Sequence, residues 1–524
     1  MKKIMIFDSM LRDGAQAEGI SFSVNDKLKI VKALDDLGID YIEAGNPGSN
    51  PKDLEFFERA KDIELKHSRL VAFGSTRRPD ISAADDSNVQ SLLKAATLTV
   101  AIFGKCWDFH VTEIIRTTPQ QNLEMISDTV SYLKQHGKEV VFDAEHFFDG
   151  YSANPDYAMH CLKAAADAGA DNLALCDTRG GCFPKDVYEI VSKVRETFGD
   201  KIGIHAHNDG GMGVANSIMA VEAGANSVQG TFIGYGERCG NANLSTIIPN
   251  LQVKLGYSCI PDDMLQFLTS TARHIAEIAN VILLDKMPYV GKSAFSHKGG
   301  MHIDGVAKSA VSFEHIDPAL VGNERKLLTS EVAGRMAIVS HIQKVDASLA
   351  KTSPETERII RRVKELEHQG YQFEGAEGSL LLVIRKELGL YKPFFELINF
   401  KIIGEQPYRE NMSASALIKI MVEGKPEITA AEGQGPVNAL DKALRKALEV
   451  FYPSVADMRL IDFKVRVMDS ASATASIVRV LIESSDGPDS WSTVGVSHDI
   501  LEASWIALVD SIEYKLTKDM GQKL

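Results

Sequence analysis

Two histidines spaced two residues apart, His205 and His207, carry the strongest chemical signal in the sequence. The residues 202–207 read as a β-strand, and side chains two apart on a strand point to the same side. Two imidazoles on one side can share a metal ion, and Asp13 is a candidate carboxylate ligand that would suit Zn²⁺, Mn²⁺, Co²⁺ or Mg²⁺. The alternative interpretation is a hydrogen-bonded histidine pair that caps the strand.

Arg12 and Thr178 could act on a substrate beside such a site. Arg12 is next to Asp13, and its planar guanidinium could bind a carboxylate through two hydrogen bonds. It could equally form a structural ion pair with Glu43 or Asp8. Thr178 could donate a hydrogen bond to the same carboxylate, although a threonine at a strand end is usually structural.

Glu145 and His302 are the candidates for proton transfer. Glu145 follows the apolar residues 140–142, so burial near a metal could tune its carboxylate, whereas pairing with an arginine is the everyday alternative. His302 follows a glycine pair, Gly299 and Gly300, and could reach a neighbouring active site as an acid or base. On the residues alone, a histidine in a surface loop is the more common case.

The elements that would position these residues alternate regularly between residue 4 and about residue 256. Short β-branched runs and amphipathic helical stretches follow one another, with strand candidates at residues 4–7, 41–45, 70–74, 98–103, 140–145, 173–178, 202–207 and 227–232. Eight such units predict a closed (β/α)₈ TIM barrel rather than an open doubly wound sheet. The candidate residues then fall at the C-terminal ends of strands, where barrel enzymes carry their active sites.

The rest of the chain predicts a helical linker subdomain and a duplicated α+β domain. The run 397–401 (LINFK) recurs at 460–464 (LIDFK), an offset of 460 − 397 = 63, and two helices repeat at nearly the same spacing. We therefore expect a barrel over residues 1–265, a linker over 266–390 and a duplicated module over 391–524. The module could bind a regulatory effector, form a dimer interface, or be a structural cap without a ligand.

Composition excludes several classes of protein. The chain has 524 residues with a net charge of −14, which argues against nucleic acid as a partner. No run of 18 apolar residues occurs and no signal-peptide core follows the N-terminus, so we expect a soluble cytoplasmic protein with no membrane partner. The six cysteines form no C-x-x-C pair, which predicts reduced thiols.

The sequence resembles the DRE-TIM metallolyases, whose Claisen-condensing branch contains isopropylmalate, homocitrate and citramalate synthases. The similarity covers nearly the whole chain and rests on four motifs, residues 8–16 (DSMLRDGAQ), 205–209 (HAHND), 236–243 (GERCGNAN) and the loop of His302. Of the branch, the long citramalate synthases of bacteria are the most similar.

The resemblance implies a set of roles. Asp13, His205, His207 and Asn241 would approach a divalent metal that chelates a 2-oxo acid, and Asn241 enters only through the resemblance. Arg12 would polarise the substrate carbonyl or bind its carboxylate, Thr178 would hold the carboxylate, Glu145 would take part in proton transfer, and His302 would come from the partner subunit of a homodimer. The expected substrates are pyruvate and acetyl-CoA, with isoleucine as an expected effector of the duplicated module. Whether Glu145 or His302 is the enolising base stays open.

Two positions depart from the family pattern. Phe313 stands where a tyrosine is expected, and Ala15 stands where threonine or glutamate is usual. Three alternatives also remain: another 2-oxo acid, as in isopropylmalate or homocitrate synthesis, a hydroxyacyl-CoA lyase, and a catalytically weakened paralogue that senses an effector. The 2-oxo acids differ by one or a few methylenes, and each methylene in a pocket changes the binding free energy by only about 1–3 kcal/mol. The sequence alone therefore distinguishes these substrates poorly.

Overall fold

A computed structural model describes residues 1–521 except 62, 329–333, 410–411, 469–475 and 488. The chain forms two compact units. The first comprises Met1–Phe295 and Glu314–Arg325, and the second comprises Ser296–Phe313 and Lys326–Leu524.

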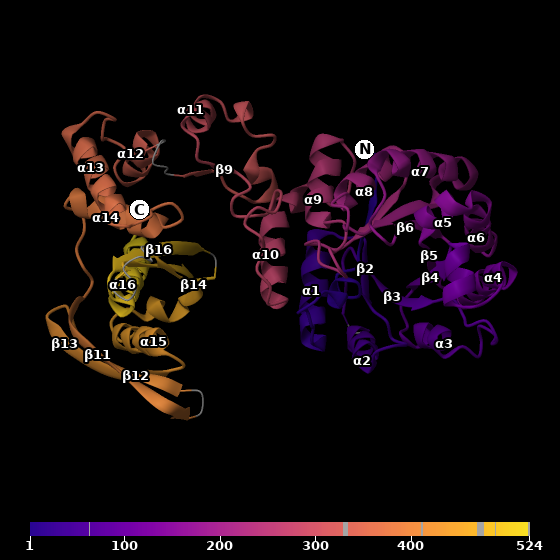
Figure 1. Ribbon diagram of the computed structural model, residues 1–524, viewed down its shortest axis with the longest axis horizontal. Helices are drawn as coiled ribbons and strands as arrows, with labels where there is room; N and C mark the ends of the chain where they lie inside the picture. Colours follow the sequence, from indigo (N-terminus) through magenta and orange to yellow (C-terminus); the bar gives the residue numbers. More distant parts are fainter. Residues whose placement is uncertain (62, 329–333, 410–411, 469–475, 488, 522–524) are drawn as a thin grey trace. The chain divides into compact units, whose positions relative to one another are not determined.

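The first unit contains a closed barrel of eight parallel strands, which confirms the predicted fold (Figure 1). Each strand pairs with the next, and β1 closes the ring by pairing with β8, with Met5 opposite Ser227. The strands are β1 (Met5–Asp8), β2 (Tyr41–Gly45), β3 (Arg69–Ser75), β4 (Thr99–Lys105), β5 (Glu139–Glu145), β6 (Asn172–Asp177), β7 (Ile202–Ala206) and β8 (Ser227–Gly230). All eight were expected, and their ends differ from the expected ones by at most two residues.

Helices connect the strands and surround the barrel. They are α1 (Val24–Leu37), α2 (Pro51–Ala60), α3 (Ser87–Lys94), α4 (Pro119–Gln135), α5 (Phe147–Ala153), α6 (Pro155–Asp167), α7 (Pro184–Phe198), α8 (Gly213–Glu222), α9 (Leu244–Pro249) and α10 (Leu268–Ile278). Local sequence sets their starts: Ser23 and Asp26 form a capping box at α1. Four of the others, α2, α4, α6 and α7, begin at a proline, whose fixed φ suits the first helical position.

The barrel interior changes from apolar to polar along the strands. Phe7, Val71, Ala101, Val141 and Ala174 form a buried apolar cluster. Because side chains repeat with a period of two along a strand, the next inward positions toward the C-terminal ends lie two residues further on. On β2, β5, β7 and β8 those positions are Glu43, Asp143, His205 and Gln229. The polar residues of the interior therefore lie closer to the C-terminal ends of the strands than the apolar cluster does.

The second unit begins with helices. α11 (Gly300–Lys308) follows the short strand β9 (Ser296–His297), which pairs with β10 (Lys326–Leu327). The helices α12 (Gly334–Val345), α13 (Pro354–His368) and α14 (Glu377–Glu387) enclose a small apolar core that contains Ile342, Val363 and Leu380.

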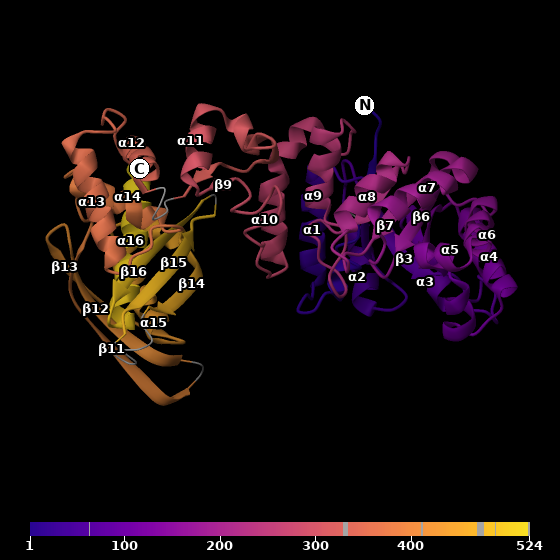
Figure 2. The ribbon, with the colours of Figure 1, turned by 45° about the horizontal axis from the view of Figure 1, so that its top comes forward.

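The remainder of this unit is the predicted duplication (Figure 2). The antiparallel sheet β11 (Glu396–Arg409), β12 (Met412–Val422) and β13 (Lys425–Gly433) is followed by α15 (Pro436–Leu448). The sheet β14 (Arg459–Val467), β15 (Val478–Ser485) and β16 (Ser490–Ser497) is followed by α16 (Ile500–Asp519). Apolar residues of both copies join one core, which contains Ile418 and Leu440 of the first and Ile482 and Leu508 of the second.

Among the described residues, no helix has both the length and the apolar character needed to cross a bilayer.

Candidate metal centre

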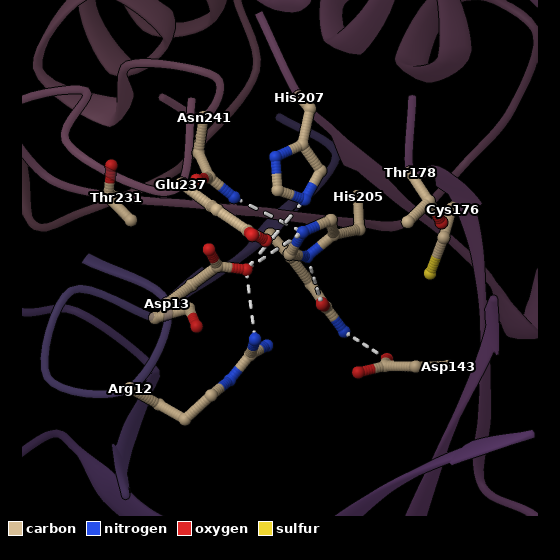
Figure 3. A network of polar contacts seen from close by, with 12 residues as sticks. Arg12, Asp13, Asp143, Cys176, Thr178, His205, His207, Thr231, Glu237 and Asn241 are labelled. Carbon is tan, nitrogen blue, oxygen red and sulfur yellow. Dashed lines mark hydrogen bonds and ion pairs between the residues drawn. The ribbon is translucent and has the colours of Figure 1, made fainter. Parts of the chain in front are cut away.

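Asp13, His205 and His207 converge at the C-terminal end of the barrel (Figure 3). Oδ2 of Asp13 lies 3.5 Å from Nε2 of His205 and 3.9 Å from Nε2 of His207. His205 is on β7, His207 follows that strand directly, and Asp13 lies in the turn after β1, where its N–H donates to the carbonyl of Ser9. All three side chains are buried. The structure therefore brings together the three residues that the sequence predicted as metal ligands.

A hydrogen-bonded chain behind His205 fixes the orientation of its ring. Nδ1 of His205 lies 2.9 Å from Oε1 of Gln229, and Nε2 of Gln229 donates to Oδ1 of Asp143 at 2.8 Å. Because the Gln229 amide donates to Asp143 through nitrogen, its oxygen accepts from His205, which places the ring proton on Nδ1. In the neutral ring, Nε2 of His205 is thereby left unprotonated, and it faces Asp13 and Asn241. Metal-binding histidines regularly donate their other ring N–H to an acceptor, as His205 does to Gln229.

Asn241 completes the cluster from the loop after β8. Its Nδ2 lies 3.2 Å from Nε2 of His205, and its backbone bridges to His207. The loop approaches so closely that a Cβ on Gly236 would lie 1.8 Å from Oδ1 of Asn241, so only glycine fits there. Arg238, at a positive φ of 56°, anchors the loop by donating to Asp209 at 2.7 and 3.0 Å.

The charges in the cluster favour cation binding. Burial alone would raise the pKa of Asp13, but Arg12 and His205 outweigh burial and hold that pKa well below its ordinary value. Burial, followed by the charge of His205, lowers the pKa of His207 to about 4. The pKa of Asp143, in contrast, is raised to about 6, chiefly by burial. The ionised carboxylate of Asp13 and the neutral ring of His207 are in the state that a metal ion requires of its ligands. Burial opposes the charged form of His205, but Asp13 raises the pKa of that ring, so a metal ion would displace a proton there.

The residues present fit a divalent metal ion. Oδ1 of Asp13, Oδ1 of Asn241 and Nδ1 of His207 are buried and have no hydrogen-bond partner within the described ranges of the chain. Leaving buried polar atoms unpaired is costly, and a bound cation would engage the two oxygens. One carboxylate, two imidazoles and an amide oxygen suit Mn²⁺, Mg²⁺, Zn²⁺ or Co²⁺.

Arg12 lies beside this cluster. Its NH1 donates to Asp13 at 2.9 Å, its Nε donates to Glu43 at 2.6 Å, and its guanidinium stacks 3.9 Å from the ring centre of Phe73. Burial opposes the charged form, yet Glu43 and then Asp13 raise the pKa of Arg12 above its ordinary value. The ion pair with Glu43 that the sequence left as an alternative is thus formed, together with a contact to the candidate metal ligand.

Thr178 and Glu145 lie at the same end of the barrel. Thr178 follows β6, and its Oγ1 accepts a hydrogen bond of 2.8 Å from the backbone N–H of His146. Glu145 ends β5 and forms an ion pair with Lys105, the last residue of β4. The expected alternative for Glu145 was an arginine partner, and a lysine takes that place.

His302 does not belong to the barrel unit. It lies on α11 of the second unit, where its exposed ring stacks on Phe313 with the ring centres 4.1 Å apart. Phe313, the departure from the family pattern, is therefore the immediate neighbour of the histidine within its own unit.

Sequence reasoning missed Gln229, Lys105 and His146. A signal for Gln229 existed, because a glutamine two residues after Ser227 on a buried strand is an inward polar residue that needs a partner. Lys105 pairs with Glu145 of the neighbouring strand, and the backbone of His146 donates to Thr178 after β6. These partners can be recognised only when neighbouring strands are aligned.

Known families match nearly the whole chain. The family described as HMGL-like matches residues 3–276, the homocitrate synthase post-HMGL domain-like family matches 289–371, and the LeuA allosteric (dimerisation) domain matches 374–516. An (R)-citramalate synthase of Aquifex aeolicus is 52% identical over 99% of this chain and 98% of its own length. A second, from Synechocystis, is 50% identical over 98% of this chain and 96% of its own length.

More distant proteins also match. A protein of Methanopyrus kandleri named "Probable 2-isopropylmalate synthase" is 30% identical over 97% of this chain and 98% of its own length. A solved structure of the HMG-CoA lyase of Bacillus subtilis is 20% identical, covers 54% of this chain and 96% of its own, and has a TM-score of 0.47.

Proposed function

The chain belongs to the family of (R)-citramalate synthases, and from that premise we propose which of its residues carry out the reaction. The enzyme condenses acetyl-CoA with pyruvate and hydrolyses the product to (R)-citramalate and CoA. The observation that carries the residue assignment is the buried cluster of Asp13, His205 and His207, with Arg12 hydrogen-bonded to Asp13.

Asp13, His205, His207 and Asn241 would hold a divalent cation. When bound, such an ion polarises a carbonyl group and stabilises negative charge that develops on its oxygen. The four residues supply one negative charge, that of Asp13, and three neutral donors. With a divalent cation bound, the site would therefore carry a net positive charge, which attracts an anionic 2-oxo acid.

Arg12 and Thr178 bind the pyruvate carboxylate and the carbonyl oxygen. Glu43 and the Phe73 ring hold the Arg12 guanidinium in one orientation. Its remaining N–H groups can therefore donate to the substrate without loss of side-chain entropy on binding. Oγ1 of Thr178 already accepts from the N–H of His146, which leaves its own proton to be donated to a carboxylate oxygen.

Glu145 and His302 are the two candidates for removing a proton from the methyl group of acetyl-CoA. Glu145 is in the barrel unit, and Lys105 balances the charge of its carboxylate. His302 is on α11 and would come from the partner subunit of a homodimer, an assembly that the LeuA dimerisation domain supports. The resulting enolate attacks the pyruvate carbonyl carbon, and water then cleaves the thioester.

Release of CoA thiol from acetyl-CoA tests this function. With Mn²⁺ or Mg²⁺, we expect pyruvate to be preferred over 2-oxobutyrate, 2-oxoisovalerate and 2-oxoglutarate, and a chelator to abolish the release. The preference should be about 5- to 150-fold per added methylene, because one methylene in a pocket is worth about 1–3 kcal/mol. A preference for 2-oxoisovalerate would make the protein a 2-isopropylmalate synthase, and silence with every acid would favour a lyase or a sensor.

We further propose that the enzyme serves isoleucine biosynthesis and that isoleucine inhibits it through residues 391–524. The support is the duplicated module and its match to the LeuA allosteric domain. Isoleucine, but not leucine or valine at equal concentration, should slow CoA release by the full chain, and a chain truncated after Phe395 should not respond. A metal-induced rise in melting temperature should show that the truncated barrel is folded. Unchanged inhibition of the truncated chain would contradict the proposal.

A further inference from the structure

A second group of ionisable side chains lies at the C-terminal ends of β4, β5 and β6, and the proposed reaction does not use it. The rings of His110 and His146 pack against each other with centres 4.0 Å apart and planes tilted by 39°. Trp107 lies 5.2 Å from the ring of His110 and 5.8 Å from that of His146. His146 follows Glu145 directly, so this histidine pair is adjacent to a residue proposed to transfer protons.

His146 has a carboxylate partner of its own. Its Nδ1 lies 3.3 Å from Oδ2 of Asp149, and Oδ1 of Asp149 accepts from Arg179 at 3.3 Å. A carboxylate at Nδ1 places the ring proton there and leaves the lone pair of Nε2 available to accept a proton. It also stabilises the imidazolium that forms on protonation, which is the arrangement of a histidine base with its orienting acid.

The backbone of His146 holds the ring in one place. Its φ of 58° lies in the left-handed region, which residues other than glycine adopt uncommonly and which occurs disproportionately at functional sites. In this conformation the N–H of His146 donates to Oγ1 of Thr178 at 2.8 Å. The backbone of His146 therefore contacts Thr178, the residue proposed to bind the substrate carboxylate.

His110 is the neutral neighbour of His146. Burial, followed by the charges of His146 and Lys105, lowers the pKa of His110. Its Nδ1 is buried and lacks a hydrogen-bond partner in the part of the chain that the structure describes. A neutral ring packed against His146 adds no competing positive charge beside that imidazole.

We propose that His146, oriented by Asp149, is the base that activates water for hydrolysis of the thioester. Water gives a proton to Nε2 of His146 as its oxygen bonds to the thioester carbon of citramalyl-CoA. The carbon–sulfur bond then breaks, and the leaving CoA sulfur takes the proton back from His146. One water is consumed, citramalate and free CoA are formed, and the imidazole returns to its neutral state. This inference rests on the proposed function and assigns its second half.

The two half-reactions, condensation and thioester hydrolysis, require different proton transfers. Enolisation needs one base for a carbon-bound proton, and Glu145 and His302 are available for it. Thioester hydrolysis needs a group that first accepts a proton from water and then donates it to a leaving thiolate, and an imidazole can do both near neutral pH.

Separate assays of the two halves test this role. In His146→Asn, which tolerates a positive φ and so keeps the N–H donated to Thr178, hydrolysis of synthetic citramalyl-CoA should fall by about 10²–10⁴-fold. Formation of citramalyl-CoA from acetyl-CoA and pyruvate, followed by mass spectrometry in a single turnover, should change by less than about threefold. Asp149→Asn should show a smaller loss in the same half. The matched control is His136→Asn, because His136 also packs against a ring, that of Tyr132 with the ring centres 4.4 Å apart, but precedes β5.

The outcomes separate this inference from the function on which it rests. Accumulated citramalyl-CoA in His146→Asn, with both halves normal in His136→Asn, supports the role. Hydrolysis at the native rate, or an equal loss in both halves, overturns it and leaves the citramalate reaction standing. A native protein that consumes no acetyl-CoA with pyruvate and metal overturns the proposed function and the inference together.

Discussion

Replacing Asp13 with asparagine is expected to lower the affinity of the barrel site for Mn²⁺ by more than about 10³-fold, because loss of a residue that merely orients a ligand already costs 10–100-fold. The Asp13 carboxylate supplies the negative charge of the ligand set and lies 3.5 Å from Nε2 of His205. Calorimetry measures the affinity directly. A ligand at 100 times its Kd stabilises a protein by about 2.7 kcal/mol, so saturating Mn²⁺ should raise the melting temperature of the native protein and leave that of the variant unchanged.

The matched control is Asp128→Asn. Asp128 also forms an ion pair with an arginine, Arg77 at 2.6 Å, but its side chain is 55% exposed on α4. Its loss should leave Mn²⁺ affinity unchanged, although stability should fall by more than the roughly 1 kcal/mol of an exposed ion pair, because the Arg77 side chain is only 9% exposed. If Asp13→Asn binds Mn²⁺ as tightly as the native protein, the carboxylate is not a ligand.

The barrel could be predicted because its signal is local. Each strand is a short apolar run followed by enough residues for one helix, and a strand buried on both faces needs no partner to be recognised. The ends of β4 and β8 were less accurate, by up to two residues. Lys105 ends β4 because it pairs in register with Glu145 of β5, and that pairing is a property of two strands rather than of one.

The candidate site divides in the same way. His205 and His207 could be found from spacing, and Asp13 from its place after the first strand. Asn241 could not, because it reaches the histidines through a glycine-rich loop whose path depends on a backbone bridge to His207. The support that Gln229 and Asp143 give to His205 could not be predicted either, since it joins side chains from three different strands.

Arg12→Lys is expected to lower kcat/KM for pyruvate by about 10²–10³-fold, the range for loss of one directed donor at a developing negative charge. Lysine keeps the positive charge but has a single nitrogen. It cannot donate to Glu43 and Asp13 at once while lying flat on the Phe73 ring, as the guanidinium does at 2.6, 2.9 and 3.9 Å. The lysine ammonium would be drawn to the two carboxylates and leave the substrate without a directed donor. Steady-state release of CoA thiol at varied pyruvate measures the loss.

Two further measurements separate substrate binding from metal binding. Arg12 contacts the candidate ligand Asp13 through a hydrogen bond, so Mn²⁺ affinity of Arg12→Lys should fall by at most about 10–100-fold, which is less than the loss of more than about 10³-fold expected for Asp13→Asn. Arg195→Lys serves as the control, because Arg195 pairs with Asp200 at 3.3 Å on the surface and its replacement should leave kcat/KM unchanged. Native turnover by Arg12→Lys would show that charge alone suffices at this position. A loss of Mn²⁺ affinity as large as that of Asp13→Asn would instead assign Arg12 to the support of the metal ligand.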